Sequence, residues 1–267
     1  MTTTHTLEVP GARLHYEVRG TGPLLVVAGS PMNAAAFAPF ADALAADHTV
    51  ITLDPRGISA SVLDDPGADS TPELRADDVA AILDDLGAPS ADVFGSSGGA
   101  VTGLALAARH PGRVRTLVAH EPPVLAVLPD APERHAATER IIDTFHRHGV
   151  GPAFGEFMAV AGYENADGPP GEPTEQDLAD AARFFAHELR GTTRYVPDVA
   201  ALTAGPARVV IGVGAESGPL LTHRTSTELA RRLGTPPVEF PGEHGGFITH
   251  PREFADVLRK VLADTPV

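Results

Sequence analysis

Short apolar runs alternate with longer segments of helical spacing along most of the chain. Two alternating segments, 4–9 and 12–20, are joined by Pro10-Gly11, which predicts a β-hairpin. Six further apolar runs have the length of strands and lie at 23–29, 48–54, 91–96, 114–120, 207–217 and 237–242. They lack strict alternation, which is typical of strands buried on both faces of a sheet.

Segments with helical spacing separate these runs and lie at 34–47, 71–87, 99–112, 224–234 and 251–262. One of them begins with Thr71 as an N-cap and Pro72 at the first helical position, and it ends at Gly87. Because strand and helix alternate, we predict an α/β fold with a mostly parallel central sheet flanked by helices.

The alternation breaks over residues 121–206, where we find helical patterns and no convincing strand. These helical patterns include one at 131–149 and another at 174–191, and a polar loop at 164–175 lies between the two. We therefore predict a core formed by residues 1–120 and 207–267, with a helical cap formed by residues 121–206.

Composition narrows the classes of partner. The chain has 267 residues and a formal net charge of −15, so it repels nucleic acids and anionic membranes, and we expect neither as a partner. The absence of cysteine excludes disulfides and thiolate catalysis. No apolar run approaches the roughly 20 residues of a membrane helix, and no signal peptide pattern is present. We expect a cytoplasmic protein with a small-molecule substrate, no metal and no cofactor.

A glycine-rich turn, Gly95-Ser96-Ser97-Gly98-Gly99, links an apolar run to a helical segment and fits the pattern G-x-S-x-G. A sharp strand-to-helix turn strains its central residue, requires small neighbours and exposes the central side chain above the sheet. The helix N-terminus also favours developing negative charge. Ser97 is therefore the candidate nucleophile, whereas Ser96 occupies a position whose side chain should point away.

A serine hydroxyl needs a base, and the chain offers twelve histidines. His244 lies in a glycine-flanked loop between the last apolar run and the closing helix, from which it can reach the turn. His250 precedes Pro251 and is better explained as a residue at the helix start. His120 is the other rival.

These features, in this order, resemble the α/β-hydrolase superfamily over essentially the whole chain. The matching segments are LLVVAGSP, VITLDPRGISAS (with Ser59 where the superfamily's D-x-R-G-x-G-x-S loop usually has glycine), GSSGGA and PGEHGGF. The resemblance implies that Ser97 attacks and His244 accepts its proton. It also implies that the backbone N–H groups of Ser30 and Gly98 form the oxyanion hole.

The acid of the triad is where this chain departs from the superfamily. The acid is usually an aspartate after the penultimate strand, where this chain has Glu216 in GVGAESG. Some members place it after the strand that follows the nucleophile strand, where this chain has Glu121 in LVAHEPP. We favour Glu216 and keep Glu121 as its rival.

A serine at this turn favours acyl transfer, because members that attack alkyl carbon use aspartate there. We expect a serine hydrolase that forms an acyl-enzyme on an ester or lactone of a small, fairly apolar metabolite. A carbon–carbon hydrolase, a perhydrolase, or a non-hydrolytic member that binds a ligand or acts as a cyclase is the alternative. Phe154, Phe157 and Met158 of the cap are candidates for the substrate pocket, although packing of the cap explains them more simply.

Overall fold

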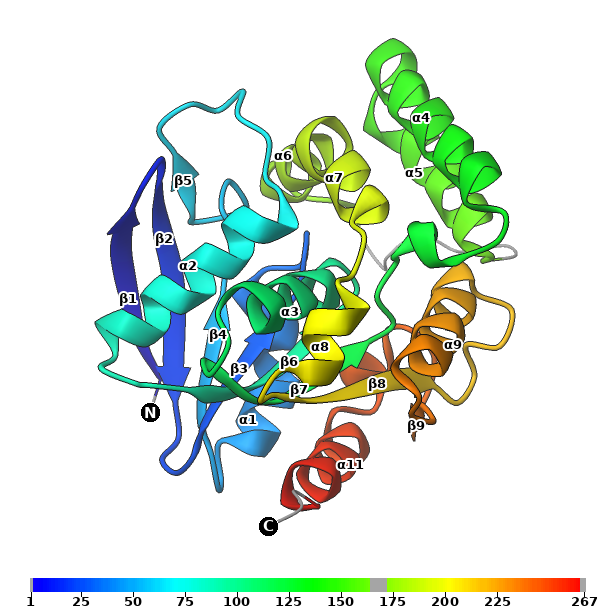
Figure 1. The fold of residues 1–267 in the computed structure, drawn as a ribbon. Coiled ribbons are helices and arrows are strands. Elements are labelled where there is room, and N and C mark those ends of the chain that lie inside the picture. The colour runs from blue at the N-terminus through cyan, green and yellow to red at the C-terminus, as the bar shows by residue number, and fades with distance from the viewer. Residues whose placement is uncertain (1, 164–171, 265–267) are drawn as a thin grey trace.

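The computed structural model describes residues 2–163 and 172–264. In these residues the strands form one sheet in the order β1-β2-β4-β3-β6-β7-β8-β9, with β5 paired to β2 (Figure 1). The strands are β1 (Thr2–Val9), β2 (Ala12–Arg19), β3 (Leu24–Ala28), β4 (Thr49–Leu53), β5 (Val62–Leu63), β6 (Ala91–Ser96), β7 (Val114–His120), β8 (Arg208–Gly214) and β9 (Val238–Phe240). Antiparallel pairing is confined to the edge that holds β1, β2, β4 and β5, and the remaining pairs are parallel. The predicted mostly parallel sheet is confirmed.

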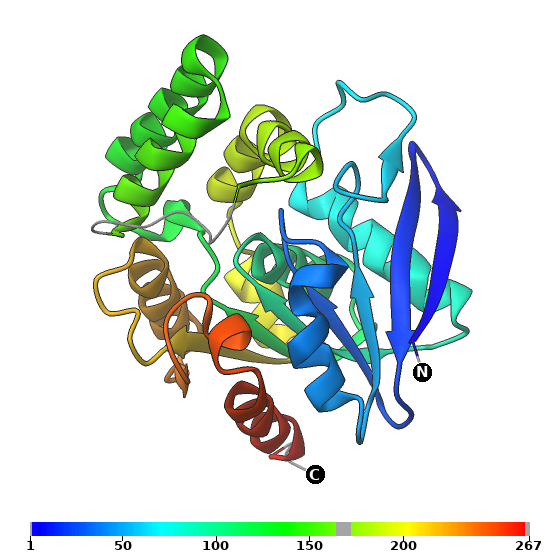
Figure 2. The same ribbon diagram turned by 180° about the vertical axis from the view of Figure 1, so that it is seen from behind.

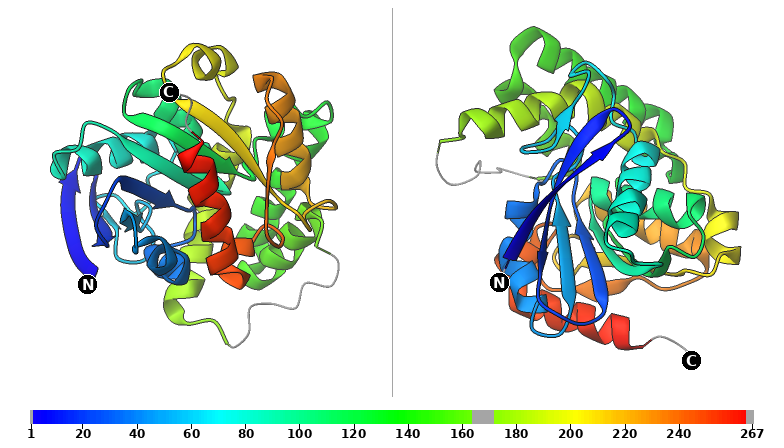
Figure 3. Two further views of the ribbon diagram at one scale, coloured as in Figure 1. Left: turned by 90° about the horizontal axis from the view of Figure 1, so that it is seen from below. Right: turned by 90° about the vertical axis from the view of Figure 1, so that its left-hand side faces the viewer.

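The central strands are buried on both faces, which explains why their sequences do not alternate. In β3, Val26 and Ala28 pack into one hydrophobic cluster, whereas Leu25 and Val27 pack into another on the opposite face. Figure 3 shows the N-terminal hairpin, in blue, at the edge of the sheet opposite to β8 and β9.

Helices cover both faces of the sheet (Figures 1 and 2). One cluster takes in α2 (Pro72–Asp85), α3 (Gly98–Arg109), α8 (Val199–Ala204) and α9 (Leu221–Leu233). The other takes in α1 (Ala38–Leu44), α10 (Gly246–Thr249) and α11 (Pro251–Ala263), with the short 3-10 helix η1 (Ala34–Phe37). The predicted N-cap is present, because the Thr71 hydroxyl accepts a hydrogen bond from the Leu74 N–H at 3.3 Å.

The described residues between β7 and β8 form helices and loops, and most of them stand apart from the sheet (Figures 1 and 2). They hold η2 (Leu125–Val127), α4 (Ala131–His148), α5 (Val150–Ala161), α6 (Glu175–Arg183), a π-helical turn η3 (Phe184–Glu188) and α7 (Leu189–Arg194). A separate cluster that includes Ile141, Ala153 and Phe185 packs these helices together. α8 differs, because Leu202 belongs to the main core. The part of the insertion that stands over the core therefore ends before Val199.

The sequence pattern missed α5, and it merged α6, η3 and α7 into one helix. Most of the loop predicted at 164–175 lies outside the described residues. Within the described parts of the chain, we find no helix whose length and apolar character would let it cross a membrane.

Candidate active site

Ser97 occupies a strained turn between β6 and α3. Its backbone has φ 55° and ψ −123°, in a region that residues with a Cβ adopt at a cost of about 1–3 kcal/mol. The Ser97 N–H donates a hydrogen bond to the His120 carbonyl at 3.0 Å, which ties the turn to β7. The side chain is half-buried, and the helix N-terminus begins directly after it. Ser97 thus has the backbone geometry that a nucleophile elbow needs.

The glycines around Ser97 are required by backbone contacts. A Cβ at Gly95 would lie 2.3 Å from the Gly99 carbonyl oxygen, and one at Gly99 would lie 2.1 Å from the Ala28 carbonyl oxygen. The turn therefore packs directly against β3 and the loop that follows it, with no space for a side chain.

Ser30 and Gly98 are direct neighbours. A Cβ at Gly98 would lie 2.7 Å from the Ser30 carbonyl oxygen and 3.1 Å from Ser30 Oγ. The loop after β3 and the first residue of α3 thus meet beside Ser97. The structure brings together the two residues that the resemblance assigns to the oxyanion hole.

His244 lies in the loop between β9 and α10 and forms a hydrogen bond with Glu121. The two atoms, His244 Nδ1 and Glu121 Oε2, are 2.6 Å apart. An ionised carboxylate only accepts hydrogen bonds, so Nδ1 carries the proton and Nε2 of the neutral ring is left as an acceptor. His120 contacts both His244 and the turn. Its ring stacks on that of His244, with centroids 6.2 Å apart, and its carbonyl accepts the hydrogen bond from the Ser97 N–H.

Glu121 is held rigidly at the end of β7. Its side chain is fully buried, and its backbone has φ 50°. Oε1 accepts a hydrogen bond from the Gly214 N–H at 3.0 Å, and Oε2 accepts a second one from Thr222 Oγ1 at 2.9 Å. Burial raises the pKa of Glu121, but the hydrogen bond and the charge of His244 outweigh it and bring the pKa to about 2. This carboxylate is therefore ionised at neutral pH.

The preference for Glu216 as the partner of His244 is wrong. Glu216 follows β8 on the exposed side of the turn, and its backbone N–H donates to the Gly242 carbonyl at 2.9 Å. Within the described residues its side chain forms no hydrogen bond with His244. Both glutamates follow the end of a strand. The pattern of apolar and polar residues could not show that Glu121, with its φ of 50°, would place its carboxylate beside Gly214 and His244. Thr222 and Gly214, which hold Glu121, carried no recognisable sequence signal.

The rival pair Ser96 and His120 is buried in the core. Ser96 Oγ lies 3.2 Å from His120 Nδ1, and both residues are 0% exposed. Phe94, Phe240 and Phe254 pack around the His120 ring. Burial lowers the pKa of His120 to about 3, so this ring is neutral at physiological pH. Neither side chain of this pair reaches the surface of the described structure.

In the loop after β4, the side chains of Asp54 and Arg56 have structural partners. Asp54 accepts hydrogen bonds from the backbone N–H groups of Ala34 at 2.8 Å and Ala60 at 3.0 Å. Arg56 forms a two-pronged ion pair with Asp78 of α2.

Ser59 has a backbone conformation that favours glycine, and its side chain forms contacts that a glycine could not make. Its φ is 50°, a conformation that favours glycine. Its N–H and Oγ donate hydrogen bonds to the two carboxylate oxygens of Asp180 in α6, at 2.9 and 2.6 Å. Asn33 Nδ2 donates to the same hydroxyl at 2.8 Å. Ser59 therefore binds the cap to the core.

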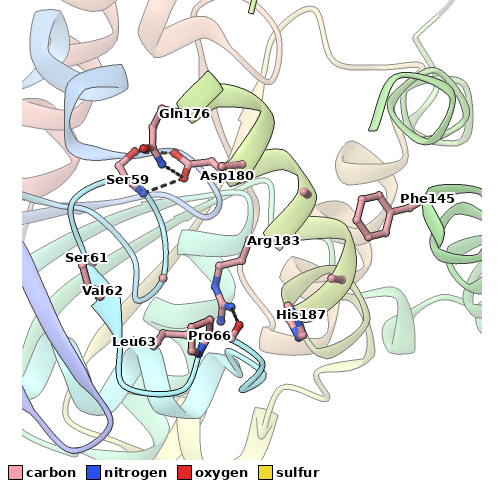
Figure 4. A pocket seen from close by; sticks show the side chains of 14 residues that line it. Ser59, Ser61, Val62, Leu63, Pro66, Phe145, Gln176, Asp180, Arg183 and His187 are labelled. Carbon is pink, nitrogen blue, oxygen red and sulfur yellow. Dashed lines mark hydrogen bonds between the residues drawn. The ribbon is translucent and has the colours of Figure 1, made fainter. Parts of the chain in front are cut away.

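A surface groove of about 460 Å³ follows this contact between the cap and the core (Figure 4). Its polar side chains already have partners: Asp180 binds Ser59 and Gln176, and Arg183 binds the carbonyls of Pro66 and Ala68. Neither Ser97, His244 nor Glu121 lines it. We interpret the groove as the seam along which α6 contacts the loop after β4.

Phe154, Phe157 and Met158 lie on α5. Phe157 packs edge-to-face against Phe184 and Phe185, with ring centroids 5.5 and 6.2 Å away, and belongs to the cap's own cluster. Phe154 is 36% exposed. None of the three lines the groove in Figure 4, and their assignment to a substrate pocket stays a prediction. Among the described residues, no three His, Asp or Glu side chains converge as metal ligands.

Comparison with known proteins identifies the family. The family model for the alpha/beta hydrolase fold matches residues 22–166. An uncharacterized hydrolase from Bacillus subtilis, YraK, is 34% identical over 265 residues, covering 96% of this chain and 95% of that protein. A zearalenone hydrolase from Cladophialophora bantiana is 29% identical over 264 residues, covering 94% and 95%. A thermophilic esterase from Thermogutta terrifontis has the same fold, with a TM-score of 0.74, 21% identity and 98% coverage of both chains. The chain therefore belongs to the α/β-hydrolase fold family, and it is a hydrolase of that fold.

Proposed function

We propose that this protein is a serine hydrolase that cleaves an ester or lactone of a small, fairly apolar metabolite through an acyl-enzyme. One observation carries the proposal: a strained Ser97 lies beside Ser30 and Gly98, and His120, whose carbonyl binds the Ser97 N–H, stacks its ring on His244 of the His244–Glu121 pair. This arrangement contains a nucleophile, a base with an orienting carboxylate, and an anion site.

In the first half of the proposed reaction, Ser97 Oγ attacks the substrate carbonyl carbon while His244 Nε2 takes the hydroxyl proton. The negative charge that develops on the carbonyl oxygen is bound by the N–H groups of Ser30 and Gly98, each of which contributes about 3–4 kcal/mol. Glu121 stabilises the imidazolium and holds the ring in the tautomer that leaves Nε2 free. His244 then protonates the departing alkoxide, which leaves an ester on Ser97.

In the second half, His244 Nε2 takes a proton from a water molecule, and the resulting hydroxide attacks the acyl carbon. Ser97 Oγ leaves as the alcohol after it regains the proton from His244, and the carboxylic acid is released. Together, the two halves of the reaction consume one water molecule for each ester bond cleaved, so the chemistry needs no cofactor.

The relatives support hydrolysis of a small organic molecule. YraK is named a hydrolase, and the relative from Cladophialophora bantiana is named for the hydrolysis of zearalenone. The small, fairly apolar character of the metabolite and the cytoplasmic location stay predictions.

The direct test is intact-protein mass spectrometry after treatment with a fluorophosphonate. We expect one adduct on the wild type and on Ser96→Ala, and none on Ser97→Ala. Turnover of p-nitrophenyl butyrate and of a panel of lactones should fall at least about 10³-fold in Ser97→Ala. A wild type that gives neither an adduct nor turnover would contradict the proposal and favour the non-hydrolytic alternative.

A further inference from the structure

The cap places a buried carboxylate against the loop that carries Ser30. Ser30 Oγ donates a hydrogen bond to Glu188 Oε2 at 2.7 Å, although 158 positions separate the two residues. Ser30 is 2% exposed and Glu188 is 0% exposed, so water does not compete for this contact. It joins the helical insertion directly to a residue of the proposed oxyanion hole.

The local backbone of the cap delivers this carboxylate. Glu188 is the last residue of the π-helical turn η3, and its φ of −124° departs from helical geometry. A π-helical turn inserts an extra residue into a helix and re-aims the side chains that follow, and such turns are frequent at functional sites. Phe185 in the same turn packs into the cap's own cluster. One turn therefore anchors the cap and directs Glu188 toward the core.

Two guanidinium groups offset the charge of Glu188. Arg75 Nη1 lies 3.7 Å from Oε2, and Arg183 Nε lies 3.9 Å from Oε1. Arg75 is itself fixed, because it donates hydrogen bonds to Thr102 in α3 at 3.0 Å and to Thr192 in α7 at 2.9 Å. Burial raises the pKa of the Glu188 carboxyl, while Arg75, Ser30 and Arg183 act in the opposite direction. The site is built from both the core and the cap.

We propose that Glu188 is a positioning residue for the oxyanion hole: it holds the Ser30 hydroxyl, and thereby fixes the backbone N–H of Ser30 beside Gly98. This inference rests on the proposed function, in which that N–H binds the developing oxyanion. Ser30 Oγ lies between Glu188 and the space above Gly98, so a change in its direction would move the loop relative to α3. A displacement of about 1 Å at such a donor costs up to about 100-fold in rate.

The arrangement makes catalysis depend on the seating of the cap. Glu188 belongs to the cap, whereas Ser30 and Arg75 belong to the core. The proposed oxyanion hole is therefore positioned by two parts of the chain that are far apart in sequence, and its geometry depends on the packing of Glu188 against Ser30 and Arg75.

Three variants test this positioning role on hydrolysis of p-nitrophenyl butyrate. Ser30→Ala keeps the backbone N–H and removes only the hydroxyl. Glu188→Leu removes the acceptor, whereas Glu188→Gln keeps an oxygen that can accept from Ser30. We expect kcat to fall about 10- to 100-fold in Ser30→Ala and Glu188→Leu with KM within about twofold of wild type, and to recover to within about threefold in Glu188→Gln.

The double variant Ser30→Ala/Glu188→Leu isolates the contact. We expect its loss of kcat to match that of either single variant, because both remove the same hydrogen bond. Affinity for an alkyl trifluoromethyl ketone, which forms a tetrahedral oxyanion on the serine, should fall in parallel with kcat/KM. Three results would overturn the inference. In the double variant, the two losses of kcat could multiply. Alternatively, folded Ser30→Ala could keep the kcat of wild type, or Glu188→Gln could be as impaired as Glu188→Leu.

The outcomes separate this inference from the proposed function. If Ser97→Ala abolishes turnover while Ser30→Ala and the Glu188 variants match wild type, the hydrolase proposal stands and the positioning role fails. If Ser97→Ala retains turnover, the proposed function itself fails. Glu188→Leu removes the partner of Arg75 in this ion pair, so thermal unfolding of each variant is measured first. If Glu188→Leu does not fold, Ser30→Ala still tests the inference, because it keeps the ion pair between Arg75 and Glu188.

Discussion

Glu121 and His244 are 123 positions apart in the chain, yet their side chains meet in a hydrogen bond of 2.6 Å. The parallel pairing of β6 with β7 aligns Ser96 with His120, so the residues that follow, Ser97 and Glu121, lie at the same edge of the sheet. The loop after β9 brings His244 to that edge. The geometry of the proposed triad thus follows from sheet order, and the glutamate after β7, the strand next to the one that precedes Ser97, is the one that meets the histidine.

Substitution of Glu121 by Gln should lower kcat on the order of 10³- to 10⁴-fold, because an amide no longer stabilises the imidazolium or fixes its tautomer. Glu216→Gln is the matched control, since Glu216 is also a glutamate after a strand end but is exposed. It should retain kcat within about twofold of wild type. Steady-state kinetics with p-nitrophenyl butyrate measures both, and a larger loss in Glu216→Gln than in Glu121→Gln would contradict the assignment.

Substitution of Ser59 by Ala should lower the free energy of unfolding by about 1–2 kcal/mol. The variant keeps the backbone at φ 50° but loses the hydroxyl contacts with Asp180 and Asn33. Ser59→Gly loses the same contacts but relieves the backbone strain, so it should be the more stable of the two variants. Urea denaturation compares them with wild type, and a Ser59→Ala variant as stable as wild type would show that the cap contact is energetically neutral.

Substitution of Gly99 by Ala should destabilise the fold by about 3 kcal/mol or more. Its Cβ would lie 2.1 Å from the Ala28 carbonyl oxygen and 2.7 Å from Gly29 Cα, both of which are backbone atoms that cannot move aside cheaply. Gly155→Ala is the control, because this glycine lies in α5 with no described heavy atom within 4 Å of the added Cβ. It should stabilise the protein by about 0.5–1 kcal/mol. Thermal unfolding that ranks the two variants in the reverse order would refute the packing described here.

Local signals predicted the fold and supplied the candidates Ser97 and His244 for the site. The apolar runs of β3, β4, β6 and β7 and the caps of α2 are short-range features, so their sequence is sufficient to place them. Ser97 and His244 were predicted for the same reason, because glycine-rich turns mark both. Helix α5 was missed because Gly151, Pro152 and Gly155 weaken the helical pattern, and the helix is stabilised by packing within the cap.

The acid and the cap contacts could not be predicted from sequence because they depend on tertiary geometry. Glu121 and Glu216 both follow the end of a strand, and the contacts that distinguish them, with Gly214, Thr222 and His244, come from distant parts of the chain. Glu188 lies within a helical pattern that gives no sign of a π-helical turn. Its contact with Ser30 appears only once the cap is folded over the core.

His120 should make the folded protein sensitive to mild acid. Its pKa is about 3 in the fold, against 6.5 for the unperturbed ring, because burial disfavours the charged form. Below pH 6.5 the unfolded chain therefore takes up a proton that the folded chain does not accept. The free energy of unfolding therefore falls as the pH drops from about 6.5 toward 3, and His120 contributes up to about 1.4 kcal/mol per pH unit to this fall.

The variant His120→Gln removes this proton linkage, so its free energy of unfolding should depend less steeply on pH between about 6 and 4. Urea denaturation of wild type and variant at several pH values measures the difference between their slopes. The variant should also retain turnover within about tenfold, whereas His244→Gln should lose it almost completely, because His244 is the histidine whose ring forms a hydrogen bond with Glu121. Equal pH slopes in His120→Gln and wild type would mean that His120 titrates alike in the folded and unfolded chains. If His120→Gln lost as much turnover as His244→Gln, His120 would again be a candidate for the base.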